Sequence, residues 1–411
     1  MHALPGDVHF IAGIVIFIAS YVVFAFGKFP GMKIDRPGMA IIGAVLMVAF
    51  RVVTAESALQ SVDFATIVLL FSMMLVVANL RLVGFFDLLA EFVVARLGPA
   101  HLLPAVIIST GVLSAFFVND IICLVMVPIV LKITKRMGVP PMGYLLAVAT
   151  ASNIGSVATI TGNPQNILIG SSSGISYTSF LAHLGPIAVV GLFLDWAILH
   201  WMFRDQLNGR SQTDGESARE DSKSPKLLKP GIVVAFVIIG FLIGFPPALV
   251  AAVGAAIILI TRSMEPRRVY DEVDWGLLVF FVGLFVIVGG AQKVGIVDDM
   301  LHIATNWNVH NFAIFSIVTA ILSNLVSNVP AVMLLKSLVP QFPDPHRAWL
   351  LLAMASTLAG NLTITGSIAN IIVVEGARKE VTIGFKDYLR VGVPITILTL
   401  AFGTLWLGAI Q

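Results

Sequence analysis

The chain carries apolar stretches long enough to cross a lipid bilayer, and they recur along its length. Residues 9–27, HFIAGIVIFIASYVVFAFG, form the first, and residues 64–80, FATIVLLFSMMLVVANL, form another. Only 12% of the residues are charged, whereas a soluble domain has roughly 25%. Because about 20 apolar helical residues span the hydrocarbon core, the sequence predicts an all-α membrane protein with about ten transmembrane helices.

The sequence also excludes several classes of protein. The opening apolar stretch has neither a basic start nor a clear small-residue cleavage site, so it is interpreted as a transmembrane helix and not as a signal peptide. The single cysteine, Cys123, excludes an internal disulfide. Because the sequence lacks a Walker A motif, a nucleophile elbow and paired carboxylates, we expect no enzyme activity, no cofactor and no nucleic-acid partner.

Basic residues are distributed unevenly between the predicted loops. With the N-terminus outside, 21 of the 25 lysines and arginines fall on the cytoplasmic side, and the exceptions are Arg51, Lys293, Lys336 and Arg347. Cytoplasmic loops are enriched in Lys and Arg. The distribution therefore predicts a multi-pass protein of the plasma (bacterial inner) membrane with both termini outside. It also requires two segments that enter and leave the membrane on one side.

The polar tract 207–230 divides the chain into two halves that resemble each other, 1–206 and 231–411. The tract is interpreted as a cytoplasmic linker. Each half crosses the membrane an odd number of times in this topology, so the halves are predicted to be inverted repeats, which are typical of secondary transporters. The aligned segments are 61–89 with 272–300, 113–120 with 322–329, and 158–169 with 362–373.

In each half, two short apolar arms surround a polar tip. The first pair, about 102–134, has Asn119 and Asp120 at its tip, and the second, about 312–340, has Ser327 and Asn328. Each arm is short for a span, and both arms return to one side in the charge distribution, so the pairs are interpreted as re-entrant helical hairpins. The alternative is a single kinked helix whose polar tip packs against a neighbour.

A helix interrupted by polar and helix-breaking residues follows each hairpin. The helix of about 142–171 reaches Gly162 and Pro164, and proline inside a helix removes a backbone hydrogen bond. The helix of about 347–375 contains TITGSIAN at the corresponding place. Unwound backbone at membrane depth needs an ion, a substrate or water, and half-helix N-termini suit anions. The alternative role for these small polar residues is to hold helices together.

Two carboxylates lie inside predicted membrane segments. Asp120 stands at the tip of an apolar hairpin with no basic residue nearby in sequence. Ionisable residues within the membrane are costly and usually functional, so Asp120 is a candidate proton-binding or cation-binding residue. The alternative is a structural cap on the second arm. Asp195 lies midway along the helix 183–203, and the second half has no matching carboxylate.

These motifs resemble the ion-transporter superfamily of arsenite efflux permeases, divalent-anion symporters, citrate carriers and Na⁺/H⁺ antiporters, and most closely its bacterial anion permeases near the arsenite branch. The resemblance rests on FFVNDIICLVMVPIV at 116–130, VSNVP at 326–330, GNPQN at 162–166 and GSIAN at 366–370. It implies that both tips and both loops surround one site near the midplane, with Asn119 and Asn328 as cation (Na⁺) or substrate ligands. It also implies a homodimer.

The candidate site residues belong to these four segments and their flanks. They are Asn119, Asp120, Asn153, Thr159, Thr161, Gly162, Asn163, Asn166, Ser327, Asn328, Asn361, Thr363, Thr365, Gly366, Ser367 and Asn370.

The sequence and the resemblance together predict an ion-coupled secondary transporter of a small anion or oxyanion-like solute, working by alternating access. Arsenite or antimonite and dicarboxylates are candidate solutes. Asp120 favours H⁺ over Na⁺ as the coupling ion. The alternatives are a Na⁺/H⁺ antiporter of the same fold and a passive channel. A separate ATPase partner stays open by analogy with arsenite pumps.

Overall fold

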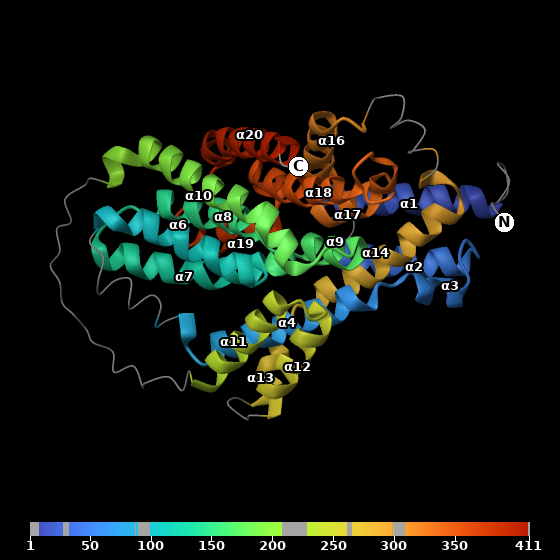
Figure 1. The fold of residues 1–411 in the computed structure, drawn as a ribbon, viewed down its shortest axis with the longest axis horizontal. Helices are drawn as coiled ribbons and strands as arrows, with labels where there is room; N and C mark the ends of the chain where they lie inside the picture. Colours follow the sequence, from blue (N-terminus) through green and yellow to red (C-terminus); the bar gives the residue numbers. More distant parts are fainter. Residues whose placement is uncertain are drawn as a thin grey trace.

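The computed structural model describes residues 8–27, 33–86, 88, 99–207, 228–260, 265–297, 299 and 309–409, and the regular elements among them are helices (Figure 1). Most of the predicted linker, 208–227, lies outside the described residues. Within them, five helices are long and apolar enough to cross a membrane by length and composition. They are Val8–Phe26, Phe64–Leu82, Tyr177–Arg204, Trp275–Lys293 and Phe385–Ala409.

The first half of the chain contains three of these five spans, which belong to α1, α4 and α10. Its elements are α1 (Val8–Phe26), α2 (Arg36–Ala49), α3 (Ala55–Ser61), α4 (Phe64–Leu82), α6 (Pro99–Phe116), α7 (Asn119–Met137), α8 (Met142–Ser156), the 3-10 turn η1 (Ile160–Gly162), α9 (Pro164–Ser173) and α10 (Tyr177–Leu207).

The second half repeats this order. Its elements are α11 (Leu228–Ile243), α12 (Pro247–Ile260), α13 (Pro266–Asp271), α14 (Trp275–Lys293), α16 (Phe312–Val326), α17 (Asn328–Leu335), η2 (Val339–Gln341), α18 (Pro345–Leu358), η3 (Ala359–Asn361), η4 (Ile364–Gly366), α19 (Ile368–Ala377) and α20 (Phe385–Ala409).

The helices pack in two groups, each built from both halves of the chain (Figure 1). In the first group, α2 packs against α14 and α4 against α12, while α1 and α11 lie on α2 and α12. In the second group, α6, α7, α8 and α10 pack together with α18, α19 and α20. Because α2 and α4 match α12 and α14 in chain order, these two pairings are equivalent contacts between the halves.

Glycines allow the closest helix contacts. A Cβ on Gly155 of α8 would lie 2.1 Å from the carbonyl oxygen of Gly111 on α6. A Cβ on Gly283 of α14 would lie 2.5 Å from the carbonyl oxygen of Ala40 on α2. Small residues let membrane helices approach backbone to backbone, and such contacts occur in both helix groups.

The polar tips lie where one helix ends and the next begins. Helix α6 ends at Phe116 and α7 begins at Asn119, while α16 ends at Val326 and α17 begins at Asn328. Ser327 between them has φ 77°, a left-handed conformation that is unusual for a residue other than glycine. The first pair of arms is longer than the sequence pattern indicates, because α7 continues to Met137, and α17 is shorter because it ends at Leu335.

The interruption of the first broken helix starts earlier than Gly162 and Pro164 predict. Helix α8 already ends at Ser156, and α9 begins at Pro164. The physical reason is side-chain competition: the Asn166 amide donates to the Ser156 carbonyl and the Thr159 carbonyl, 3.0 Å each. Pro164 opens α9 at a position where a backbone N–H is not needed.

Candidate functional site

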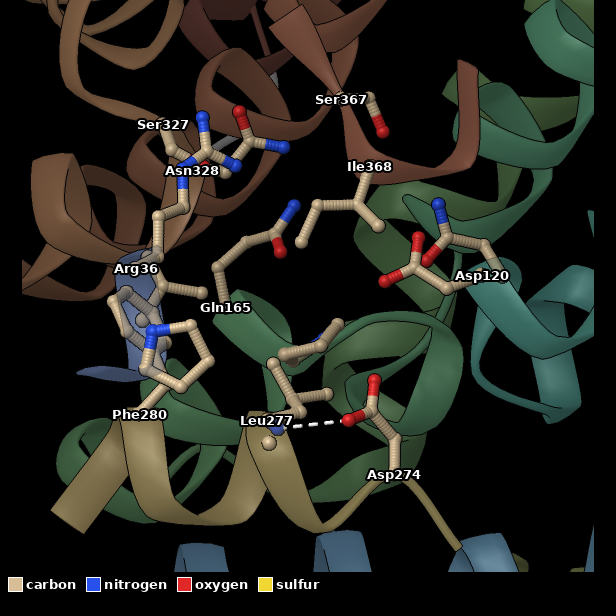
Figure 2. A pocket seen from close by; sticks show the side chains of 15 residues that line it. Arg36, Asp120, Gln165, Asp274, Leu277, Phe280, Ser327, Asn328, Ser367 and Ile368 are labelled. Carbon is tan, nitrogen blue, oxygen red and sulfur yellow. Dashed lines mark hydrogen bonds between the residues drawn. The ribbon is translucent and has the colours of Figure 1, made fainter. Parts of the chain in front are cut away.

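A cavity of about 140 Å³ lies between the two helix groups, and Figure 2 shows the side chains around it. Both tips reach it: Asn119 and Asp120 from the first, Ser327 and Asn328 from the second. Both helix restarts also reach it, through Gln165 of α9 and through Ser367 and Ile368 at α19. Helices α2 and α14 close the other side with Arg36, Pro37, Asp274, Gly276, Leu277 and Phe280; Pro164 and Val329 complete the lining.

The lining residues share one position in their helices. Except for Phe280, they are the N-cap or first-turn residues of α2, α7, α9, α14, α17 and α19. Six helix N-termini thus face one small space. A helix N-terminus carries a partial positive charge and backbone N–H groups without an intrahelical acceptor, so the cavity has a positive electrostatic bias from the backbone alone.

Asn153 on α8 connects the first tip to the second broken helix. Its Oδ1 accepts from Asn119 Nδ2 and from Ser367 Oγ, 3.0 Å each. Its Nδ2 donates to Asn361 Oδ1 at 2.8 Å and to Asn370 Oδ1 at 3.0 Å. Two of these partners line the cavity and two lie behind it, so Asn153 holds the lining side chains without lining the cavity itself.

Thr357 on α18 occupies the position in the second half that is equivalent to Asn153. Whereas Asn153 binds the broken helix of the second half, Thr357 binds that of the first. Its Oγ1 accepts from Asn163 Nδ2 and Gln165 Nε2, 3.1 Å each, so it binds the first broken helix. In the orientation that satisfies its partners, Asn328 accepts from Gln165 Nε2 at 3.2 Å and donates to the carbonyls of Ser356 and Gly366. Each broken helix is therefore tied to the other half of the chain.

The two unwound loops have the same local geometry. Asn370 donates to the carbonyls of Gly360 and Thr363, as Asn166 does to those of Ser156 and Thr159. Thr159 and Thr363 have matching backbone angles, φ −137°, ψ 163° and φ −135°, ψ 162°. A Cβ on Gly162 would lie 2.2 Å from the Ser156 carbonyl oxygen, so only glycine fits there.

Several predicted site residues have structural contacts instead of a place at the cavity. Thr159 donates to the Ala115 carbonyl, and Thr161 pairs with Tyr177 Oη at 3.0 Å. Thr363 donates to Asn324 Oδ1 at 3.2 Å. The predicted residues outside the lining are Asn153, Thr159, Thr161, Gly162, Asn163, Asn166, Asn361, Thr363, Thr365, Gly366 and Asn370.

Three polar lining residues escaped the sequence reasoning. Arg36 looked like an ordinary loop cation, and its Nε donates to the Phe24 carbonyl at 3.0 Å, which leaves other guanidinium donors available. Asp274 caps α14 by accepting from Leu277 N at 2.9 Å (Figure 2). Gln165 stood inside the quoted motif without a role. All three stand at a helix start: Arg36 and Gln165 in the first turns of α2 and α9, and Asp274 at the N-cap of α14.

Among the described residues, the cavity is lined by one cationic and two acidic side chains. Arg36 faces it from α2, Asp274 from α14 and Asp120 from α7 (Figure 2). The Asp120 carboxylate interacts with Asp274 and with the backbone of Ala369 in the first turn of α19. The ionised Asp120 carboxylate is therefore repelled by the charge of Asp274 and stabilised by the N-terminus of α19.

The sequence profile of the CitMHS family, described as citrate transporter, matches residues 21–355. The chain belongs to the CitMHS family. Members of this family are secondary transporters, so the protein is a multi-pass membrane transporter and not an enzyme.

Individual relatives cover the chain almost end to end. It is similar to the silicon efflux transporter LSI3 of Oryza sativa subsp. japonica, with 30% identity over 94% of this chain and 95% of that protein. It is also similar to a Dictyostelium discoideum protein that carries the name transporter arsB, with 25% identity over 90% of this chain and 87% of that one.

The crystal structure of the Alcanivorax borkumensis YdaH transporter has a similar fold. It matches with a TM-score of 0.57 at 12% identity and covers 98% of both chains. The CitMHS protein is therefore an all-helical membrane protein with a YdaH-like transporter fold.

Proposed function

We propose that this protein is a proton-coupled secondary transporter of a small anion or oxyanion-like solute, and that the cavity between the two helix groups is its solute site. The observation that carries the proposal is the convergence of six helix N-termini with Arg36 on one cavity. One water molecule, which has one heavy atom, needs roughly 10–15 Å³ of cavity volume. A cavity of about 140 Å³ therefore holds a solute of up to about ten heavy atoms. That size includes inorganic oxyanions and small dicarboxylates.

The side-chain charges support coupling to a proton. With Asp120 and Asp274 both ionised, two negative charges oppose one guanidinium, and a bound anion adds to the repulsion. Protonation of Asp120 leaves Arg36 and Asp274 balanced. Anion binding and proton binding at Asp120 therefore favour each other, and by linkage the effect is reciprocal. The anion should bind more tightly as the pH falls.

The packing supports alternating access. The lining residues come from both helix groups, so a movement of one group against the other changes every side of the cavity. We infer that the group with the tips and broken helices moves and that α1, α2, α4, α11, α12 and α14 form the scaffold. The strained backbone of Ser327 lies at one of the moving tips.

Two contacts between the halves agree with the proposed topology, in which both termini are outside and the linker is cytoplasmic. Arg81 pairs with Glu272 at 2.6 Å, and the charge distribution puts both on the cytoplasmic side. Lys293 Nζ donates to Ser57 Oγ at 3.0 Å, and both belong to the outer side. Each contact thus joins residues that the inverted-repeat topology places on the same face.

A Na⁺/H⁺ antiporter is the second candidate, favoured by the carboxylates of Asp120 and Asp274 together with the amides of Asn119 and Asn328 at one cavity. Carboxylate and amide oxygens are ligands for hard cations. In this reading the solute is Na⁺ itself, and the helix N-termini counteract its binding.

The test is thermal unfolding of the purified protein with a panel of anions, arsenite and Na⁺ at two pH values. A ligand that binds only the folded state at a hundredfold excess over its Kd stabilises by about 2.7 kcal/mol. We expect an anion to raise the melting temperature, more strongly at the lower pH, and Arg36→Gln to abolish this shift.

Lys132→Gln, which removes a cation of α7 far along the helix from Asn119, is the matched control and should keep the shift. A shift with Na⁺ alone, and with no anion of the panel, would replace the anion proposal by the antiporter.

A further inference from the structure

Another carboxylate lies deep in the helix group of α6, α7, α8, α10, α18, α19 and α20, outside the cavity. Asp195 stands in the membrane-spanning part of α10 and has 0% exposure. Neither carboxylate oxygen makes a hydrogen bond within ordinary geometric limits. An isolated ionised carboxylate in an apolar interior is far less stable than the neutral acid. The environment of Asp195 in this conformation therefore favours the protonated form.

The groups that face Asp195 are polar but not cationic. From α8, the Thr150 hydroxyl lies close enough to interact, although its own hydrogen bond goes to the Leu146 carbonyl at 2.9 Å. From α20, Tyr388 interacts with Asp195, and Cys123 of α7 also interacts with Tyr388. The phenolic oxygen of Tyr388, also fully buried, has no hydrogen bond within the same limits. Among the described residues, no lysine, arginine or histidine acts on the carboxyl.

A chain of hydrogen bonds leads from this cluster to the cavity. The Thr150 carbonyl accepts from Asn361 Nδ2 at 3.2 Å. Asn361 Oδ1 accepts from Asn153 Nδ2 at 2.8 Å, and Asn153 Oδ1 accepts from Asn119 and Ser367 of the lining. A change of charge at Asp195 would therefore act on side chains that are one or two contacts from the solute.

The repeat shows that packing alone does not demand a carboxylate here. Counted from Pro186 of α10 and Pro394 of α20, the position equivalent to Asp195 is Gly403, which packs against Met354. In the second half, α20 thus packs against α18 at the equivalent position without an acidic side chain.

We propose that Asp195 is a second proton-binding site of the transport cycle, distinct from the cavity and linked to it through Thr150, Asn361 and Asn153. It holds its proton in this conformation and releases it when α8, α10 and α20 repack in the other. The inference rests on the proposed transport function for its place in the cycle, but the protonated state of Asp195 is independent of the solute.

Infrared difference spectroscopy of the purified protein tests that state directly. We expect a C=O stretching band of a protonated carboxyl group that is absent in Asp195→Asn and present in Asp120→Asn. Tyr388→Phe keeps the Asp195 carboxyl and removes the neighbouring phenolic hydroxyl, so it should shift the C=O band. This variant replaces Asp195→Asn in the test if Asp195→Asn does not fold. A band unchanged by both Asp195→Asn and Tyr388→Phe would overturn the proposal.

The coupling role is tested by solute-driven proton movement in proteoliposomes. Asp195→Asn should keep the solute-dependent melting shift but move only about half as many protons per solute, because Asp120 still carries its own proton, and Asp195→Glu should restore most of the movement. Wild-type proton movement in Asp195→Asn would refute the coupling role. If no anion of the panel stabilises even the wild type, the cavity proposal fails, while the infrared result still decides the protonation of Asp195.

Discussion

Replacement of Asn153 by alanine examines how the cavity lining is held. The Asn153 amide makes four hydrogen bonds to side chains, and each partner belongs to another helix or loop. Its oxygen serves two donors and its nitrogen two acceptors, so the amide is fully used. Asn153→Ala removes all four bonds at once and leaves the backbone of α8 unchanged.

The expected loss of stability follows from these bonds. Side-chain hydrogen bonds between membrane helices average about 0.6 kcal/mol, so four contribute about 2.5 kcal/mol. Asn361 and Asn370 have 0% exposure, and an unsatisfied buried acceptor costs about 1–3 kcal/mol. Asn119 and Ser367 line the cavity, where water can replace the lost partner. With two such acceptors at the low end of that range, the predicted total is about 4.5 kcal/mol.

The assay is equilibrium unfolding in mixed micelles with an added denaturing detergent. Ser152→Ala is the control, because Ser152 is equally buried in the same helix and donates to the Ala149 carbonyl one turn back. It should cost less than about 1 kcal/mol. If both variants lost the same small amount, Asn153 would not be the connection between the halves that its contacts indicate.

Three further outcomes follow from the structure. Asp120→Asn should fold normally, because Asp120 faces the cavity, and should make solute binding independent of pH; a pH dependence like that of the wild type would exclude Asp120 as the linked proton site. Gly155→Ala should cost about 3 kcal/mol of stability through its clash with Gly111, whereas Gly185→Ala, whose Cβ would make only an ordinary 3.4 Å contact, should cost little; equal effects would contradict the close approach of α6 and α8. A cysteine label placed within 207–230, in a variant without Cys123, should react from the cytoplasmic side alone, and labelling of intact cells from outside would reverse the topology.

The local pattern of apolar and polar residues was enough to predict a helical membrane protein. The apolar runs require helices because lipid offers the backbone no hydrogen-bond partner. The repeated tips and loops indicated where the helices end, and Asn119, Asp120, Ser327, Asn328 and Ser367 do line one cavity.

Where the pattern was less accurate, contacts distant in sequence decided the outcome. Helix α8 stops at Ser156 because Asn166, ten residues later, takes its carbonyl. Thr159 and Thr161 carry the same polar signal as the tip residues, yet they bind the end of α6 and Tyr177. A polar side chain in an apolar sequence shows that a partner is needed, but not which partner it has.

The sequence by itself determined that this chain is a helical membrane transporter with two similar halves, because hydrophobic length, charge distribution and helix-breaking residues are local properties. Only the tertiary structure decided that six helix N-termini converge, that Arg36, Gln165 and Asp274 join the cavity, and that Thr150, a neighbour of Asp195, is connected to it through Asn361 and Asn153. These relations join residues more than 200 positions apart, and they exist only once the two halves have packed against each other.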